Sequence, residues 1–174
     1  MNLLLKLLGG LAMLVLVLVA AAFFFPREYR VERSTVIKAP VAAIHAQLAD
    51  MRNWRSWTVW HERDPAMTNT FSAAQGVVGA WSKWESKTEG NGQSTLTEVT
   101  PNRIVYRLEF PDMGMQSTGT FVLTPQPDGV QVVWSDTGDL GMNPLSRWFG
   151  LFLDGMIGPD FEGGLARLKR NLEQ

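Results

Sequence analysis

The last stretch of the chain, residues 143–172, constrains the fold more than any other. Asn143-Pro144 pairs a favourable helix cap with a proline at the first helical position, where a missing N–H costs nothing. Apolar residues then recur at steps of three and four, which predicts one long amphipathic helix. They are Leu145, Trp148, Phe149, Phe152, Met156, Phe161, Leu165, Leu168 and Leu172.

Gly158-Pro159 interrupts this pattern. Proline clashes with the preceding helical turn, so we expect a kink or a brief break at this point. The apolar residues before the interruption are mostly aromatic and bulky, whereas most of those after it are leucine. This difference predicts that the first half of the helix closes a ligand cavity and that the second half seals a core.

Residues 67–137 show only strand and turn signals. Gly90-Asn91-Gly92, Pro101-Asn102 and Asp128-Gly129 punctuate this region at hairpin spacing. Short connections without helices make neighbouring strands antiparallel. The expected strands are residues 67–72, 80–86, 94–100, 104–110, 116–123 and 130–137.

Residues 29–37 alternate with period two and predict a first strand ahead of these six. Ala39-Pro40 then opens a helix that ends near Asp50. Asn53 caps a second, shorter helix, in which Trp54, Trp57 and Trp60 share one face best in a tight 3₁₀-like turn.

These elements predict an α+β fold. A seven-stranded curved antiparallel sheet wraps around the long C-terminal helix, which is the only element large enough to cover the apolar face of the sheet. Two short helices follow the first strand and shut one end of the resulting groove.

The N-terminal segment, residues 1–26, differs in character from the remaining domain, residues 27–174. Leu7 to Phe25 contains only apolar side chains and glycine, and as a helix it is roughly 28 Å long at 1.5 Å per residue. A cleaved secretory signal is the alternative, since Ala20-Ala21-Ala22 suits a cleavage site. Because the apolar run continues through Phe23-Phe24-Phe25, we favour an uncleaved single-pass transmembrane anchor.

Basic residues predict the orientation of this anchor. Lys6 precedes the apolar run, whereas four basic residues follow it, and the positive-inside rule then places the globular domain in the cytoplasm. The four are Arg27, Arg30, Arg33 and Lys38.

Composition excludes several classes of function. Lys6 is the only one of 16 Lys+Arg in the N-terminal segment, so residues 27–174 carry 15 basic residues against 17 acidic ones, and nucleic acid is not an expected partner. There are no cysteines and only two histidines, His45 and His61, so neither a disulfide nor a metal site is expected. No Gly-x-Ser-x-Gly elbow, P-loop or dinucleotide fingerprint occurs. We therefore expect no cofactor.

Several strings resemble a known superfamily. Residues 31–40, Val-Glu-Arg-Ser-Thr-Val-Ile-Lys-Ala-Pro, and Leu48-Ala49-Asp50 leading into Asn53-Trp54-Arg55-Ser56-Trp57 are similar to the START-like, polyketide cyclase/dehydrase superfamily (SRPBCC, helix-grip fold). Residues 26–29, 62–67 and 158–162 resemble a membrane-anchored bacterial branch of it. The resemblance implies a cavity for lipids, sterols, polyketides or hormones. Only some members of the superfamily are enzymes, and no catalytic motif is present to transfer.

The titratable side chains do not form a recognisable catalytic set. His45 lies on the polar side of the first short helix and is expected to face solvent. His61-Glu62-Arg63-Asp64 combines base, acid and cation, but a charged loop sealing the mouth of the groove explains the same residues. Asp136 shares a strand face with Trp134, yet its place near the strand end predicts exposure to solvent. No catalytic residue is assigned.

Tryptophan is unusually abundant, with seven Trp against two Tyr. Trp81 and Trp84 are three positions apart in one strand, so only one of them points inward. Aromatic and apolar side chains from the short helices, the sheet and the long helix are expected to line one apolar cavity, although an ordinary aromatic core explains them equally well. The expected ligand-binding residues are Trp54, Trp57, Trp60, Trp84, Tyr106, Phe121, Trp134, Trp148, Phe152 and Met156.

An aromatic groove beside a bilayer anchor, without a catalytic set, favours a membrane-anchored binding module for an apolar small molecule or lipid. Two alternatives stay open. One is a cyclase, dehydratase or hydrolase acting on a hydrophobic substrate, and the other is a membrane-associated interaction protein whose cavity is vestigial. The expected partners are accordingly an apolar ligand and the membrane.

Overall fold

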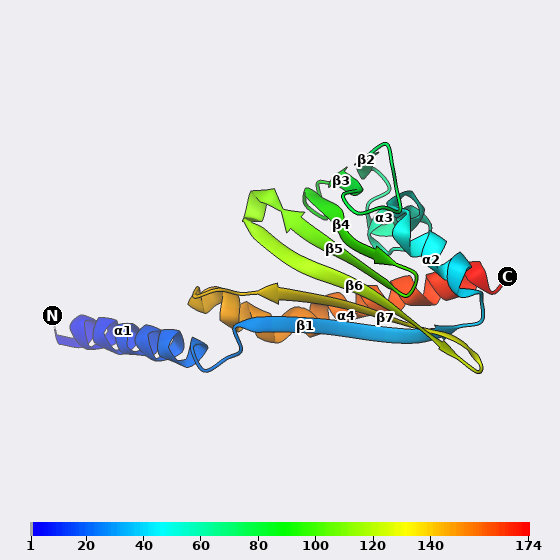
Figure 1. The fold of residues 1–174 in the computed structure, drawn as a ribbon. Coiled ribbons are helices and arrows are strands. Elements are labelled where there is room, and N and C mark those ends of the chain that lie inside the picture. The colour runs from blue at the N-terminus through cyan, green and yellow to red at the C-terminus, as the bar shows by residue number, and fades with distance from the viewer. Residues whose placement is uncertain (1) are drawn as a thin grey trace.

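The structure, a computed structural model, describes residues 2–174. An N-terminal helix projects from a domain that contains one sheet and a long C-terminal helix (Figure 1). The helices are α1 (Asn2–Ala22), α2 (Val41–Ala49), α3 (Trp60–Arg63) and α4 (Pro144–Leu172), with 3₁₀ turns η1 (Met51–Ser56) and η2 (Pro111–Met113). The strands are β1 (Glu28–Ile37), β2 (Thr68–Phe71), β3 (Trp81–Glu85), β4 (Gly92–Thr100), β5 (Arg103–Phe110), β6 (Met115–Gln126) and β7 (Gly129–Asp139).

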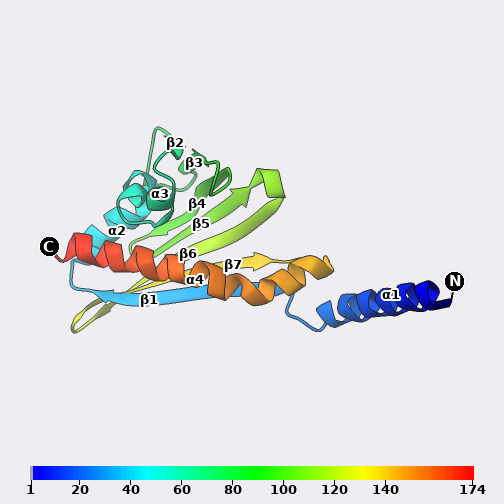
Figure 2. The same cartoon turned by 180° about the vertical axis from the view of Figure 1, so that it is seen from behind.

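The seven strands form one antiparallel sheet in the order β1-β7-β6-β5-β4-β3-β2. The first strand therefore pairs with the last, from Glu28 opposite Asp139 to Ile37 opposite Val130. A register shift near Thr97 marks a bulge in β4, and a bulge of this kind bends a sheet. The curved sheet and the long helix on its inner face form the predicted helix-grip arrangement (Figures 1 and 2).

Period-two alternation decides which face of the sheet is buried. In β6, Phe121 and Leu123 are buried whereas Thr118 and Thr124 are exposed. Successive side chains of a strand point to opposite faces, so the apolar set faces α4 and the threonines face solvent. All seven expected strands are present, with their ends shifted by a few residues.

The segment between β1 and β2 contains three short helices rather than two. The tryptophan-rich helix expected from Asn53 is divided: Trp54 lies in the 3₁₀ turn η1, Trp57 caps its end, and Trp60 begins α3. A 3₁₀ turn brings residues three apart onto one side, as the spacing of the tryptophans predicts.

Helix α4 begins and packs as its sequence indicates. The Asn143 side chain accepts a hydrogen bond from the Leu145 N–H at 2.9 Å, and Pro144 follows the cap. In the second half of the helix, Phe161 and Leu168 are buried against the sheet. Burying such side chains stabilises a fold by about 1.5–3 kcal/mol each.

Of the kink or brief break expected at Pro159, the break does not occur: α4 runs without interruption from Pro144 to Leu172. Arg33 of β1 binds the helix on both sides of the proline. Its guanidinium lies 2.8 Å from the Asp154 carboxylate and 2.6 Å from that of Glu162. Gly158 makes room for this contact, since a Cβ there would lie 1.9 Å from Arg33 Nη2.

The first half of α4 presents its apolar stripe outward, which contradicts the prediction that it closes a cavity. Phe152 is 62% exposed and Met156 is 55% exposed. Arg147 and Leu153 are the buried residues of these turns. Helical spacing identifies a face but not which neighbour it meets, and here the sheet meets the other face.

Helix α1 is long and apolar enough to cross a membrane, a property that it shares with signal sequences. It extends from the end of the domain at which α4 begins (Figure 1). Arg147 of α4 reaches the carbonyl oxygens of Phe23 and Phe25 at 3.4 Å each, just past the end of α1. The Trp148 indole N–H donates to the Leu18 carbonyl at 3.1 Å. These bonds fix the end of α1 against α4.

Candidate functional site

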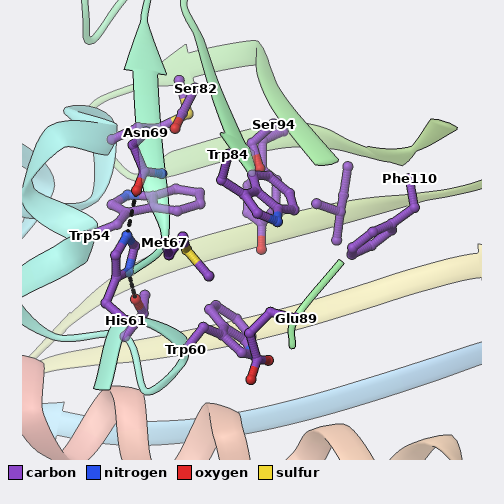
Figure 3. Close-up of a pocket in the computed structure, with 14 residues that line it drawn as sticks. Trp54, Trp60, His61, Met67, Asn69, Ser82, Trp84, Glu89, Ser94 and Phe110 are labelled. Carbon is purple, nitrogen blue, oxygen red and sulfur yellow. Dashed lines mark hydrogen bonds between the residues drawn. The ribbon is translucent and has the colours of Figure 1, made fainter. Parts of the chain in front are cut away.

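A hollow lies between the short helices η1 and α3 and the strands β2 to β5 (Figure 3). Its volume is about 120 Å³, room for several water-sized spheres at roughly 10–15 Å³ each. Most of its wall is apolar, with a few polar groups set into it. The lining residues are Met51, Trp54, Thr58, Trp60, His61, Met67, Asn69, Ser82, Trp84, Glu89, Ser94, Tyr106, Leu108 and Phe110.

Strand register places the sheet side of this wall. Ser82 of β3 is opposite Ser94 of β4, which in turn is opposite Leu108 of β5, so these side chains form one row. The two small serines leave space where larger residues would fill it. At the open side, the rings of Trp84 and Phe110 meet edge to face with centroids 5.7 Å apart.

Gly92 allows Trp84 to lie flat over β4. A Cβ at Gly92 would lie 2.2 Å from Trp84 Cζ2, well inside contact distance. Trp81, three positions earlier, does not line the hollow, as strand alternation predicts.

His61 contributes a polar patch to the wall. Its Nε2 lies 2.8 Å from Asn69 Oδ1, and its Nδ1 lies 3.1 Å from the Thr58 hydroxyl (Figure 3). With Asn69 Oδ1 as acceptor, Nε2 carries the hydrogen and Nδ1 accepts from Thr58. Both ring nitrogens are thus engaged in hydrogen bonds to neighbouring side chains.

Arg63 joins three elements at the rim. Its guanidinium pairs with Glu89 in the β3–β4 loop at 2.8 Å and with Asp160 of α4 at 2.6 Å. These two carboxylates raise the pKa of Arg63. Asp160 also accepts a hydrogen bond from the Trp60 indole N–H at 3.1 Å. The ion pairs of Arg63 therefore also hold Trp60, one of the lining residues, in place. The sealing of the hollow by this charged segment stays a prediction.

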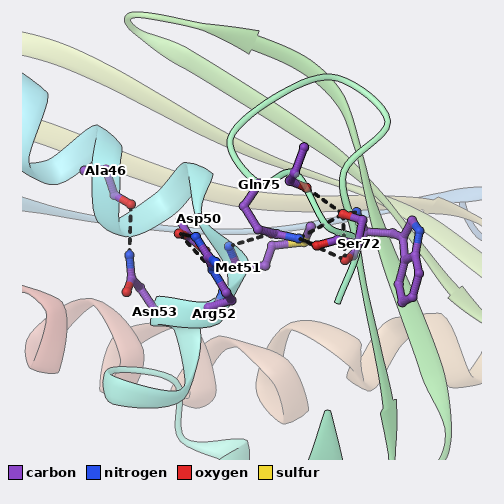
Figure 4. Close-up of polar contacts among 9 residues, drawn as sticks. Ala46, Asp50, Met51, Arg52, Asn53, Ser72 and Gln75 are labelled. Atoms are coloured by element: carbon purple, nitrogen blue, oxygen red, sulfur yellow. Dashed lines mark hydrogen bonds and ion pairs between the residues drawn. The ribbon is translucent and has the colours of Figure 1, made fainter. Parts of the chain in front are cut away.

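A polar network surrounds Met51, one of the residues that line the hollow (Figure 4). Asp50 accepts the Arg52 N–H at 3.0 Å and pairs with its guanidinium, which lowers the pKa of the carboxyl. The Gln75 side chain accepts the Met51 N–H at 3.3 Å and donates to the Ser72 carbonyl at 3.2 Å. Turn η1 is therefore tied to the β2–β3 loop, and Met51 is held in the wall.

Behind the hollow lies a solid aromatic core. Trp134 stacks on Phe161 of α4 with ring centroids 3.8 Å apart, and its indole N–H donates to the Tyr106 hydroxyl at 2.9 Å. Trp57 is fully buried, and its Nε1 has no hydrogen-bond partner within residues 2–174. These rings fill the space between the sheet and α4 where the sequence led us to expect a cavity.

The ten residues expected to bind a ligand fall into three groups. Four line the hollow: Trp54, Trp60, Trp84 and Tyr106. Three are buried in the core behind it: Trp57, Phe121 and Trp134. The last three lie outside it on the first half of α4: Trp148, Phe152 and Met156.

Two polar predictions are wrong. Asp136 is 4% exposed and accepts hydrogen bonds from the Tyr29 hydroxyl at 2.8 Å and the Ser117 hydroxyl at 2.9 Å. Burial raises its pKa, and the two hydroxyls oppose the shift. His45 is half-buried and bonds the Thr100 carbonyl at 3.0 Å rather than facing solvent.

Some lining residues were detectable in the sequence. Leu108 and Phe110 follow Tyr106 at period two, so the pattern that indicates β5 also assigns them to the inner face. Met67, Asn69 and Glu89 carry no such signal, because loops and a four-residue strand bring them to the site. Among residues 2–174, no three His, Cys, Asp or Glu side chains form a group suited to a metal ion.

Comparison with known proteins places the fold. Residues 28–173 match the family described as polyketide cyclase / dehydrase and lipid transport. The chain belongs to this family. No curated protein matches the chain at a significant level.

Several solved structures share the architecture. A Thermobifida fusca protein matches with a TM-score of 0.62 and 22% identity over 82% of this chain and 92% of its own. DynU16, from the dynemicin biosynthetic locus, matches with a TM-score of 0.58 and 18% identity over 86% of this chain. The di-domain ARO/CYC StfQ of the steffimycin pathway gives 0.60 and 17% over 84% of it. The chain spans about half of each of these last two proteins, 48% and 51%.

Proposed function

We propose that this protein is a membrane-anchored module that binds an apolar small molecule or an apolar part of a lipid in the hollow between α3 and β2–β5. The supporting observation is the hollow itself, with Trp54, Trp60 and Trp84 in its wall. Concave, mostly apolar sites with a few convergent polar groups are the usual form of ligand pockets. The family description, which includes lipid transport, agrees with this class of ligand.

The anchor is the second part of the proposal. Residues 1–26 are proposed to remain attached as a single-pass transmembrane segment, with residues 27–174 as the binding domain on the cytoplasmic side. The contact from Trp148 of the domain to α1 supports retention, since cleavage after Ala22 would remove Leu18 and its hydrogen bond. A membrane-impermeant maleimide on a Thr124→Cys variant tests the side, because the chain has no other cysteine.

Filling the hollow tests binding directly. Ser94→Leu places a larger side chain in the lining row, whereas Thr95→Leu places the same side chain on the other face of β4. The full-length proteins are purified in detergent, extracted with organic solvent, and the extracts compared by mass spectrometry. We expect apolar molecules to co-purify with the wild type and with Thr95→Leu, and to be lost from Ser94→Leu.

Identical extracts from the wild type and Ser94→Leu would overturn the binding proposal. Loss from both variants alike would also contradict it, because the effect would then follow from general destabilisation rather than from occupancy of the hollow. An overpacked but folded variant is the expected state of Ser94→Leu, at a cost of about 1–3 kcal/mol.

A further inference from the structure

An apolar stripe on the first half of α4 has no partner within residues 2–174. Leu145, Phe149, Phe152 and Met156 are spaced by four, three and four positions, and all are exposed, Leu145 by 77%. At about 100° per residue, they lie within roughly 60° of one another around the helix axis. Arg147 occupies the opposite side of the helix and is 7% exposed. The stripe is therefore one continuous face turned away from the sheet.

The contact between α4 and α1 indicates how deep the apolar stripe lies relative to a membrane. Trp148 donates its indole N–H to the carbonyl of Leu18, which lies within the potential membrane span Leu3–Ala22. The Trp148 ring also meets Phe25 edge to face with centroids 4.6 Å apart. The second turn of α4 thus lies level with the last turn of α1.

We propose that the β7–α4 turn and the first two turns of α4 lie in the interfacial layer of the bilayer, with Leu145, Phe149 and Met142 of the turn, which is 63% exposed, in contact with lipid. This inference rests on the proposed anchoring by α1. Helices α1 and α4 run in the same direction (Figure 1), so Leu145 lies deepest. Each further residue of α4 rises about 1.5 Å toward water.

The extent of the stripe favours lipid over a second copy of the chain. Spacing by four and three also suits a helix–helix seam, but such a seam requires several repeats. Beyond Met156 the next positions of the stripe are Asp160, Gly163 and Arg167, which are not large apolar residues. The apolar face is thus confined to the half of α4 that adjoins α1. Aromatic side chains such as Phe149 and Trp148 suit the interfacial layer.

Single cysteines test the depth of this face, because the natural chain has none. The full-length protein is labelled with the fluorophore NBD at one of six positions and reconstituted in vesicles of phosphatidylcholine and phosphatidylglycerol. Doxyl-labelled phosphatidylcholine serves as the membrane-restricted quencher. The six positions are Leu11 in α1, Leu145, Phe149, Phe152 and Met156 in α4, and Thr124 at the far end of β6.

We expect blue-shifted emission and strong quenching at Leu145 and Phe149, with quenching falling stepwise through Phe152 to Met156. Thr124 should be unquenched and Leu11 strongly quenched.

Quenching at Leu11 without quenching at Leu145 and Phe149 would overturn the inference and leave the anchor intact. No quenching at Leu11 would remove the anchor and the inference together. Disulfide formation between Phe149→Cys copies, without lipid quenching, would assign the face to a second copy instead.

Discussion

Asp136 is a buried carboxyl whose charge opposes folding. Its pKa is raised by burial, so the folded state holds the proton to higher pH than the unfolded chain, in which an Asp titrates near about 3.9. The free energy of unfolding therefore falls as pH rises from about 4 through the raised pKa, by about 1.4 kcal/mol per unit of pKa shift. An Asp136→Asn variant lacks this term and still offers groups for both hydroxyls, so it should become the more stable protein at neutral pH.

Urea unfolding of the full-length protein in detergent, at a series of pH values from 3 to 8, measures this difference. Asp139→Asn is the matched control, because Arg27 lowers the pKa of Asp139 to about 2. A lowered pKa stabilises the folded state above the unfolded pKa, so Asp139→Asn should lose stability relative to the wild type as pH rises, whereas Asp136→Asn should gain it. Parallel curves for the wild type and Asp136→Asn would contradict the burial of an ionisable group at this position.

The burial of Asp136 was not predictable from its neighbours in sequence. Its hydroxyl partners come from residues separated by 107 and 19 positions, Tyr29 and Ser117. Only the pairing of the first strand with the last brings Tyr29 over Gly138 and within reach of the carboxylate. The inward direction of Trp134, by contrast, follows from the alternation of its own strand.

At the scale of elements, α4 shows how a proline is accommodated inside a helix. Pro159 cannot donate to the Gly155 carbonyl, and Arg33 bridges Asp154 and Glu162 on either side of this defect. We therefore expect Arg33→Met to cost more stability when Pro159 is present than in a Pro159→Ala background. The coupling should be small but measurable, because the two carboxylates that Arg33 contacts are exposed.

A double-mutant cycle by urea unfolding measures this coupling. Arg30→Met is the control, since the ion pair of Arg30 is with Glu32 of its own strand rather than with α4. Additive effects of Arg33→Met and Pro159→Ala would show that the ion pairs do not support the interrupted turn.

Elements as such were largely predictable, because each carries its own periodicity. The six alternating runs between residues 67 and 137 and the stripe of α4 needed no tertiary information. What the stripe does not specify is its partner. Leu165 and Leu168 meet the sheet, whereas Phe149 and Phe152 face outward, although all four obey the same spacing. The side of α4 that meets the sheet stays the same, since the buried Arg147 and Leu165 are 18 positions, about five turns, apart. The apolar residues change side at the step of five from Met156 to Phe161, and only the packed structure shows which side meets the sheet.

For the whole molecule, the position of the hollow follows from how the aromatic core is filled. Trp134 and Phe161 occupy the space between the sheet and α4. The hollow therefore lies at the edge formed by β2–β5 and the short helices. That edge is assembled from η1, α3 and two loops. Sequence patterns locate these loops poorly, which is why Trp84 was predicted as a lining residue and Met67 was not.

The joint between α1 and the domain determines whether anchor and domain move as one body. Arg147 provides most of it: its guanidinium reaches the carbonyls of Phe23, Phe25 and Gly141 and lies over the Phe23 ring at 5.1 Å. Replacing it by methionine removes every one of these donors while keeping an apolar stem of similar length. We expect Arg147→Met to leave the fold of the domain intact and to release α1 from its fixed angle.

Spin labels at Leu11→Cys in α1 and Thr124→Cys in β6 report this angle in reconstituted vesicles. A narrow distance distribution is expected for the otherwise natural protein, and a broad one for Arg147→Met. Arg147→Lys serves as the control, because a lysine keeps the charge but lacks the planar fork that engages several carbonyls at once, so its distribution should be intermediate. An equally narrow distribution for Arg147→Met would show that Trp148 and its bond to Leu18 suffice to hold the domain, and that the buried arginine is not the element that joins it to the membrane helix.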